Sequence, residues 1–492
     1  MKKDLGKWLI AIVMCYSVTS SAQAQGWVAR YNGSSNQDDA ATSMAVDLSG
    51  NVYVTGQIKE TGSSPNCGTI KYNSNGDTMW IRRYNGEANQ SDVGNAIAVD
   101  LSGNVYVTGE RGMNDYVTIK YNSDGDSLWA AIYGIGAVSN YDNAYAIAVD
   151  LSGNVYVTGQ SQGTGWDYAT IKYNSAGDTM WVRRYNGPGN DEDKARKIVV
   201  DFSGNVYVTG WSVGAGTYSD YATIKYNSDG DTLWIRRYNG PDPDGNDAAQ
   251  AIAVDGSGNV YVTGYSDGMA SNDPSDYATI KYNSAGDTVW VRRYDGPGSG
   301  IGNTYDWGYA IAVDLSGNVY VTGKSCGSGT ASDYATIKYN SDGDTLWIRR
   351  YNGPGNDQDE AFAIAVDLSG NVYVTGKSMG SGTSWDYATI KYNAAGDSLW
   401  AARYNGPLGN QWDEARAIAV DGEYVYVTGI SWDGDSGTTN RGSDYLTIKY
   451  STAGVEERTN PNSQIQNAKL EICPNLSYSN AIINYAVLSS QD

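Results

Sequence analysis

A five-residue motif, V-Y-V-T-G, recurs along most of this chain and constrains its fold more than any other feature. Its eight copies lie 50 to 59 residues apart and begin at Val52, Val105, Val155, Val206, Val260, Val319, Val372 and Val425. A period near 50 residues is typical of propellers and solenoids, in which one supersecondary unit is copied many times. The composition agrees with such copying, because the 492 residues include 60 Gly and 41 Tyr but only 2 Phe.

Each unit contains four short runs with the composition of β-strands. In the seventh unit they cover residues 363–366, 372–376, 387–392 and 399–404. The runs are rich in β-branched and aromatic residues and are separated by Gly, Asn, Asp or Ser, which is typical of an antiparallel meander. No helical periodicity competes with this pattern. The sequence therefore predicts an all-β fold, an eight-bladed β-propeller of four-stranded antiparallel blades.

The two ends of the repeat region complement each other. The eighth unit stops after its third run, at residues 445–450, and no Trp-containing fourth run follows it. A run of that kind, W-V-A-R-Y, stands instead at residues 27–31. We expect this N-terminal strand to complete the last blade, because closure of the circle removes exposed sheet edges. A solenoid, the alternative architecture, would need capping units instead.

The repeated unit resembles a known family, the bacterial SBBP-type β-propeller repeat, through its D-x-A-x-A-I-A-V-D-x-x-G-N-V-Y-V-T-G pattern. The resemblance covers about residues 27 to 454. It implies a propeller fold and says little about function, because such repeats occur in many different secreted proteins.

The ends of the chain differ from the repeats. Residues 1–24 combine a basic start, a short apolar run and an A-x-A site, which predicts a secretory signal peptide. The propeller is expected over residues 25–454 and a polar linker over 455–469. Residues 470–492, with L-E-I-C-P-N, resemble the start of the immunoglobulin-like sorting domain of type IX secretion cargo and are expected to be either a truncated or a vestigial form of it. We therefore expect a secreted protein, extracellular or on the outer cell surface.

Charge and composition exclude several classes of function. The net charge of −21 disfavours binding to nucleic acid and to anionic membrane surfaces. The chain has no His, which excludes Ser-His-Asp and Cys-His catalysis. Its 4 Cys show no C-x-x-C spacing, so a zinc site is not expected. We expect a monomer that is not inserted in a membrane and that has no metal or cofactor.

Two connections in each unit vary in length while the other two remain nearly constant. The loop between the second and third strands has five residues in the second unit and fourteen in the eighth. The connection from the fourth strand to the next unit also varies. In a four-stranded meander both variable connections lie at the same end of the blade. That end is therefore the candidate binding face, although neutral drift of exposed loops gives the same pattern.

One Asp recurs in the connection before the first strand of every unit, eight residues before the Asp that ends this strand. Because the first strand is normally innermost, these carboxylates are expected to surround one mouth of the channel, where they raise one another's pKa or recruit a cation. The alternative, which the eightfold repetition favours, is that each Asp caps its own loop through backbone N–H groups. These candidate residues are Asp39, Asp92, Asp142, Asp193, Asp247, Asp306, Asp359 and Asp413.

The N-S-D-G-D turns, as at residues 122–126, weakly suggest calcium loops. The middle position is Ala in three units while Gly is retained in all, which favours a turn with positive φ over an ion site.

Aromatic residues outside the strand pattern are candidate contacts for sugar rings, with packing at the rim as the alternative. Those in the variable loops are Trp166, Trp211, Trp307, Trp385, Trp412 and Trp432, together with Tyr218, Tyr265 and Tyr305.

Three functions remain open on the sequence alone. The leading interpretation is a non-catalytic module that binds glycan or protein through the variable-loop face. The second is a polysaccharide hydrolase or lyase, because paired carboxylates work without His; its candidate pairs are Asp267 with Asp273 and Asp433 with Asp435. The third is a purely structural surface or adhesin component.

Overall fold

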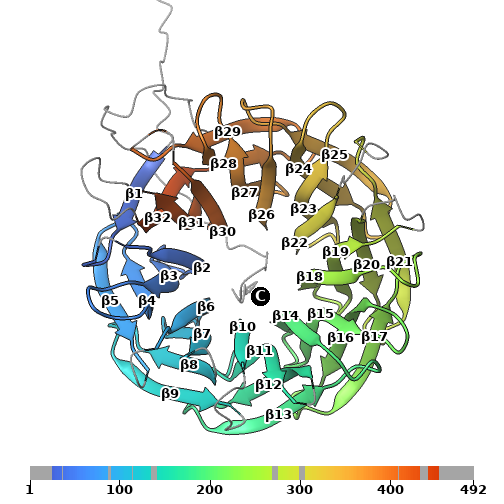
Figure 1. Ribbon diagram of the computed structural model, residues 1–492, viewed down its shortest axis with the longest axis horizontal. Helices are drawn as coiled ribbons and strands as arrows, with labels where there is room; N and C mark the ends of the chain where they lie inside the picture. Colours follow the sequence, from blue (N-terminus) through green and yellow to red (C-terminus); the bar gives the residue numbers. More distant parts are fainter. Residues whose placement is uncertain are drawn as a thin grey trace, which may run out of the picture.

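The computed structural model describes residues 25–35, 37–86, 90–112, 115–134, 141–163, 165–268, 275–298, 305–407, 409, 411–432 and 442–453. They form eight four-stranded antiparallel sheets, arranged as blades around a central axis (Figure 1). The predicted all-β, eight-bladed propeller is confirmed. The predicted signal peptide, linker and sorting tail lie outside the described residues. No helix in the described part of the chain is both long and apolar enough to span a bilayer.

Blades are numbered here from 1 to 8 in chain order, and each runs from an innermost to an outermost strand. The innermost strands are β2 (Ala40–Val46), β6 (Val93–Val99), β10 (Asn143–Val149), β14 (Asp193–Val200), β18 (Asp247–Val254), β22 (Trp307–Val313), β26 (Asp359–Val366) and β30 (Asp413–Val420). The second strands are β3 (Val52–Ile58), β7 (Val105–Arg111), β11 (Val155–Gln162), β15 (Val206–Val213), β19 (Val260–Ser266), β23 (Val319–Cys326), β27 (Val372–Met379) and β31 (Tyr424–Trp432).

The third and fourth strands complete the blades. The third strands are β4 (Asn66–Tyr72), β8 (Asp115–Tyr121), β12 (Trp166–Tyr173), β16 (Ser219–Tyr226), β20 (Asp276–Tyr282), β24 (Ser332–Tyr339), β28 (Trp385–Tyr392) and β32 (Ser443–Ser451). The outermost strands are β5 (Thr78–Tyr84), β9 (Ser127–Tyr133), β13 (Thr179–Tyr185), β17 (Thr232–Tyr238), β21 (Thr288–Tyr294), β25 (Thr345–Tyr351), β29 (Ser398–Tyr404) and β1 (Gln25–Tyr31).

The circle closes as the sequence predicts. β1 pairs antiparallel with β32, and Trp27 lies opposite Lys449 while Tyr31 lies opposite Tyr445 (Figure 1). Trp27 Nε1 and Lys449 Nζ also donate to the backbone carbonyl of Ser74 in blade 1, at 3.1 and 3.0 Å. The first and last segments of the repeat region thus share one blade, and that blade is joined to the next by the same contacts as the others.

The blades are held together by a repeated Trp–Lys contact. The Trp of each outermost strand donates its indole N–H to a carbonyl in the turn of the following blade, as Trp181 does to Ser228 at 3.1 Å. The Lys of the third strand donates to the same carbonyl, as Lys172 does at 2.8 Å. The buried Val, Ile, Ala and Tyr side chains of neighbouring blades also pack against each other. Each interface between blades therefore consists of an apolar core with these Trp and Lys hydrogen bonds at one end.

The constant turns are built on hydrogen bonds of their own Asn and Asp side chains. In the turn after β8, Asn122 Oδ1 accepts from the backbone N–H groups of Asp124 and Asp126, and Asn122 Nδ2 donates to Asp126 Oδ2 at 3.0 Å. Gly125 has φ +84°, which a residue with a side chain adopts at a cost. The N-S-D-G-D pattern is thus accounted for by turn geometry.

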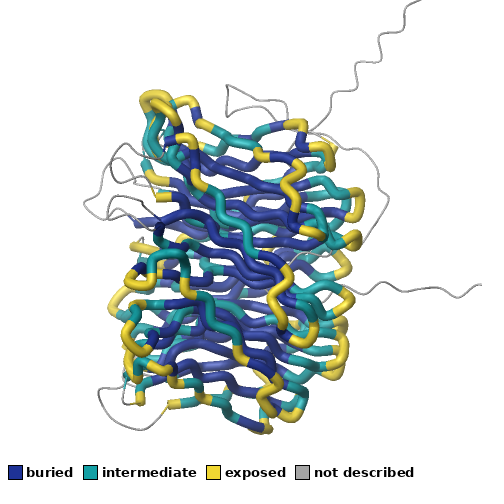
Figure 2. Tube along the Cα trace, turned by 90° about the vertical axis from the view of Figure 1, so that its right-hand side faces the viewer, coloured by how far each residue is buried: buried dark blue, intermediate teal, exposed yellow. Residues whose placement is uncertain are grey.

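Every innermost strand contains a β-bulge. In β14 the pairing with β15 shifts between Ala195 and Lys197, so that Arg196 has no partner residue in the ladder. The other seven innermost strands shift at the equivalent position. Since a bulge leaves one residue outside the regular alternation of faces, each blade presents one extra side chain near the axis. Figure 2 shows the buried strands between two fringes of exposed loops.

Candidate functional site

The two variable connections of each blade lie at the same end of the disc, which we call the loop face. In blade 7, Asp359 joins them directly, because Gly353 from one connection donates to Asp359 Oδ2 at 2.6 Å and Met379 from the other donates to Oδ1 at 3.1 Å. In blade 2, Asp92 accepts in the same way from Gly86 at 2.6 Å and from Gly112 at 3.0 Å. This face carries the candidate binding surface.

The eight predicted aspartates are anchors of these loops. All are buried, with 0 to 1% of their surface exposed, which favours the loop-capping interpretation over a ring of carboxylates that recruits a cation. They bond their own loops, as the alternative interpretation states. Burial raises the pKa of four of them to about 6, namely Asp39, Asp247, Asp359 and Asp413.

An Arg–Asp pair lies beside this anchor, and the sequence reasoning did not single it out. In blade 4, Arg237 from β17 donates to Asp220 at 2.6 Å and to the backbone carbonyl of Ser212 at 2.8 Å. Blades 3 to 8 all have this pair, with N–O distances of 2.6 to 2.9 Å. The Arg–Asp pair could have been predicted from the recurring D-Y and R-R-Y motifs, which supply its two residues.

Two blades lack one member of this pair, and in each of them another charged residue of the same blade pairs with the member that remains. Blade 1 has Asn66 in place of the Asp, and its Arg83 pairs with Glu60 at 2.9 Å. Blade 2 has Ile132 in place of the Arg, and its Asp115 pairs with Arg111 at 3.1 Å. The charge pair is therefore maintained at the base of the loops even where the motif changes.

Three positions in each blade vary while their neighbours remain constant, and they gather at the loop-face end of the channel. The bulge position holds Thr42, Asn95, Tyr145, Arg196, Gln250, Tyr309, Phe362 and Arg416. Two positions that pair with each other across the first two strands hold Ala40 with Gln57, Val93 with Glu110, Asn143 with Gln160, Lys194 with Trp211, Ala248 with Tyr265, Trp307 with Lys324, Glu360 with Lys377, and Glu414 with Ile430. The residues between them are Ala or Gly in every blade.

The bulge residues are half-buried, and two pairs from neighbouring blades pack against each other. Arg196 lies 5.6 Å from the ring centre of Tyr145, and Tyr309 lies 5.6 Å from Phe362. Sequence comparison of the repeats could reveal these positions, but attention to loop length alone missed them. The variable surface therefore includes the channel mouth as well as the loops.

The predicted tryptophans gather at this end of the molecule, and most of them have a Lys over the ring. Lys194 Nζ lies 4.7 Å from the ring centre of Trp166 and 5.2 Å from that of Trp211. Trp307 stacks on Tyr265 with a centroid distance of 4.8 Å. These aromatic residues thus pack partly against the protein's own side chains.

A second group lies on blades 7 and 8. Trp385 and Trp412 have ring centres 5.4 Å apart, and Lys377 Nζ lies 4.9 Å from the Trp385 ring. Trp412 is 37% exposed. The backbone N–H of Trp432 donates to the Trp412 carbonyl at 3.2 Å, which places both tryptophans in blade 8 on the same side.

A pocket of about 420 Å³ opens between blade 8 and blade 1 on the loop face. It combines two aromatic rings with a cation, a carboxylate and an amide. Arg416 in this pocket donates Nε–H to Glu414 at 3.0 Å. The residues that line it include Trp412, Trp432, Arg416, Asp38, Gln57 and Thr42.

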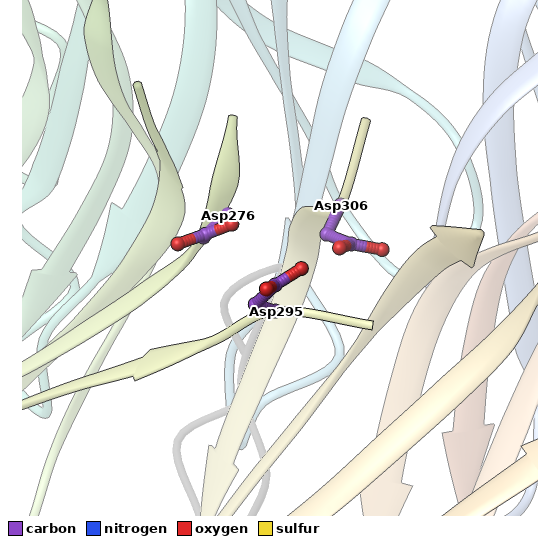
Figure 3. A group of neighbouring side chains, drawn as sticks. All are labelled: Asp276, Asp295 and Asp306. Atoms are coloured by element: carbon purple, nitrogen blue, oxygen red, sulfur yellow. The ribbon is translucent and has the colours of Figure 1, made fainter. Parts of the chain in front are cut away.

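Three carboxylates converge near blades 5 and 6 (Figure 3). Their ligand atoms lie within 4.8 Å of one another, and they belong to Asp276, Asp295 and Asp306. The protein supplies partners for two of them, because Arg293 pairs with Asp276 at 2.8 Å and Gly296 N–H donates to Asp306 at 2.7 Å. This arrangement is an ion-paired loop anchor, and we assign no metal to it.

The carboxylate pairs considered for an enzyme are only partly described. Asp267 is held by the backbone N–H of Asn246 at 2.7 Å and by the hydroxyl of Ser275. Its predicted partner, Asp273, lies outside the described residues, as do Asp433 and Asp435.

Comparison with known proteins agrees with the fold. Regulatory protein FlaEY of Caulobacter vibrioides is 28% identical over 201 residues, which cover 36% of this chain and only 20% of that protein. Sqt1 from Chaetomium thermophilum has a similar fold, with a TM-score of 0.51 and 10% identity over 86% of this chain and 100% of that chain. The family model described as SBBP, Beta-propeller repeat, matches residues 26–61, 80–110, 128–165, 181–216, 233–268, 290–329 and 346–382, more than half of the chain. The chain therefore belongs to the SBBP β-propeller repeat family.

Proposed function

We propose that this protein is a secreted or cell-surface, non-catalytic binding module and that it binds a glycan on its loop face, in the pocket between blades 8 and 1. The observation that carries the proposal is the side-chain content of this pocket. Trp412 and Trp432 offer aromatic faces, and Asp38, Gln57 and Arg416 offer hydrogen-bond acceptors and donors. A saccharide ring presents apolar C–H faces and a rim of hydroxyls, so it needs both kinds of partner.

The size and position of the pocket support this proposal. Its volume of about 420 Å³ falls within the usual range of small-ligand sites, roughly 300–1,000 Å³. The variable residues lie on strands whose other positions hardly change, which is how a rigid scaffold presents a binding surface. The basic, apolar and A-x-A segments of residues 1–24 support export, where extracellular glycans are available.

A glycan array probed with the full chain, followed by titration calorimetry on each hit, tests the proposal. Replacing Trp432 or Trp412 by Ala should weaken binding at least about tenfold, because buried aromatic contacts carry much of the energy in such sites. Trp166→Ala is the matched control, since this Trp lies on blade 3, and it should leave affinity unchanged.

Two results would contradict the proposal. The first is a hit whose affinity is insensitive to both blade 8 substitutions. The second is cleavage of a bound oligosaccharide during incubation, which would favour the hydrolase or lyase interpretation.

A further inference from the structure

The constant turns form the end of the disc opposite the loop face, and we call this end the turn face. Each blade contributes one turn between its first and second strands and one between its third and fourth. The two turns of a blade pack against each other, because a Cβ added at Gly103 in the first turn of blade 2 would lie 3.5 Å from the Cβ of Ser123 in the second. The carbonyl of Ser123 also accepts Trp80 Nε1–H at 3.1 Å and Lys71 Nζ–H at 2.9 Å from blade 1, so the turns of neighbouring blades are joined.

The turn face exposes apolar side chains at two repeated positions. The first position follows the Asp that ends the innermost strand, and its side chains are 41 to 73% exposed in the blades that have a large apolar residue there. The second position precedes the Trp of the outermost strand and is 51 to 57% exposed, from Met79 in blade 1 to Leu399 in blade 7. Exposed apolar residues that gather on one face, rather than being scattered singly, are typical of a surface that another polypeptide segment covers. Those at the first position are Leu48, Leu101, Leu151, Phe202, Leu315 and Leu368.

The described chain both begins and ends on this face. Gln25, the first residue of β1, pairs with Tyr450 of β32. Thr452 donates its N–H to the carbonyl of Glu423 at 2.7 Å, in the first turn of blade 8. The carbonyl of Thr452 accepts Lys391 Nζ–H at 2.7 Å, as the carbonyl of Ser123 accepts that of Lys71. The chain beyond Ala453 therefore starts from the turn face.

Residues 470–492 match this surface in polarity and in reach. They contain Leu470, Ile472 and the run A-I-I-N-Y-A-V-L at residues 481–488, and their charged side chains are those of Glu471 and Asp492. Residues 454–469 can span up to about 50 Å when extended, at roughly 3.3 Å per residue. A blade of four strands is about 15 Å across, at roughly 4.8 Å between strands. The segment can therefore reach the exposed side chains of more than one blade.

A second copy of the disc matches the same surface less well. Exposed carboxylates stand on the second turns, as at Asp77 and Asp126, and they would face one another if two turn faces met. Like charges brought together in an interface weaken association. Residues 470–492 carry little charge, so they meet the turn face without this repulsion.

We propose that residues 470–492 pack on the turn face and cover its exposed apolar side chains. The turn face lies opposite the proposed glycan pocket, so this contact stands whether or not that pocket binds a saccharide.

Disulfide trapping in residues 25–492 tests this contact, because the segment has a thiol of its own, Cys473. Cys67 is buried, and Cys326→Val removes the other thiol of the propeller by placing the residue that blade 4 has at that position. In this background Leu48→Cys and Leu101→Cys each place a thiol on the turn face, and Tyr218→Cys places one of similar exposure on the loop face. In oxidised glutathione we expect the intramolecular disulfide with Cys473 to form at least about tenfold faster at the two turn-face positions.

A change within the segment distinguishes packing from tethering alone. Ile482→Asn together with Ile483→Asn keeps the length of the tether but removes two apolar side chains, so it should slow trapping at Leu48→Cys at least about tenfold. The same double variant should bind more of the apolar dye ANS than the natural chain does, because the turn face is then uncovered.

Three results would overturn the proposal. The first is trapping at Tyr218→Cys that is as fast as trapping on the turn face. The second is trapping at Leu48→Cys that the double Ile variant does not slow. The third is formation of disulfide-linked dimers in place of the intramolecular bond, which would indicate that a second copy occupies the turn face.

Discussion

A single Asp in each blade holds together the two loops on which the proposed binding surface depends. In blade 7 the two carboxylate oxygens of Asp359 accept N–H groups from Gly353, 6 residues before it, and from Met379, 20 residues after it. The anchor is buried and constant, whereas the loop segments beyond it vary in length. The loops of every blade therefore vary in length only beyond a constant, buried Asp.

Removal of one anchor should destabilise the propeller measurably. Asp359→Ala leaves two buried N–H groups without an acceptor, and we expect the free energy of unfolding to fall by at least about 2 kcal/mol. Asp342→Ala is the matched control, because Asp342 is exposed and Ala occupies its position in blades 3, 5 and 7. Urea denaturation followed by Trp fluorescence measures both. Equal midpoints for the two variants would refute the anchoring role.

The same aspartates make stability depend on pH. In the folded state the pKa of Asp39, Asp247, Asp359 and Asp413 is about 6, above the ordinary value of 3.8. A pKa raised by folding gives stability that is complete below pH 3.8 and is lost as the pH rises through 6. We expect a higher unfolding temperature at pH 5 than at pH 7.5.

Repulsion within a chain of net charge −21 acts in the same direction, so the comparison should be made in about 0.5 M salt, where exposed charges are screened. A higher unfolding temperature at pH 7.5 in that buffer would contradict the assignment of the raised pKa values.

At the scale of the element, the constant turns serve the neighbouring blade as well as their own. Gly230 has φ +84°, and a Cβ added there would lie 2.9 Å from the ring of Trp181 in the preceding blade. Gly is thus required both by the backbone conformation and by the close packing of the Trp. The contact explains why the length of this turn is fixed while the loops at the other end vary.

Two glycines in blade 4 allow the effect of the positive φ to be measured separately from the effect of the Trp contact. Gly216 has nearly the same conformation, φ +86°, but a Cβ there would meet nothing within 4 Å. Gly216→Ala should cost about 1–2 kcal/mol through the left-handed backbone alone. Gly230→Ala should cost about 1–3 kcal/mol more, because it also displaces the Trp. Denaturation midpoints of the two variants check this, and equal losses would show that the Trp contact contributes nothing.

The sequence predicted the elements better than it predicted the site. Periodic strands and Gly-containing turns were visible because each is copied eight times, so the strand order and the closure by residues 27–31 followed directly. The bulge was not visible, since residues such as Tyr309 and Phe362 stand within an apparently regular alternating strand. The pocket between blades 8 and 1 was not predictable either, because its lining joins segments near opposite ends of the chain.

At the scale of the whole molecule, closure depends on one strand pairing that links the ends of the repeat region. Arg30 of β1 pairs with Asp444 of β32 at 2.9 Å, and the ladder extends from Trp27 to Tyr31. Every other blade consists of one continuous segment of chain. The last blade is therefore the place where the circle can open without the loss of any other sheet.

A chain that begins at residue 32 should show the consequence of opening. Without β1, the outer edge of β32 has unpaired backbone groups, and such edges promote association. We expect a lower denaturation midpoint and oligomers in size-exclusion chromatography with light scattering. A synthetic peptide of residues 25–31 should restore the monomer. Unchanged mass and midpoint in the shortened chain would show that β1 is dispensable.

The bulge in each innermost strand separates one variable side chain from the residues that make the blade fold. Its side chain contributes no ladder pairing, so one residue can be exchanged for Thr, Tyr, Gln or Arg without a change of strand register. Gene duplication of a blade followed by a change of this one residue therefore alters the chemistry of the channel mouth at little cost in stability. The eight bulge positions are therefore suitable for engineering, because one substitution in each blade changes the side chains at the channel mouth.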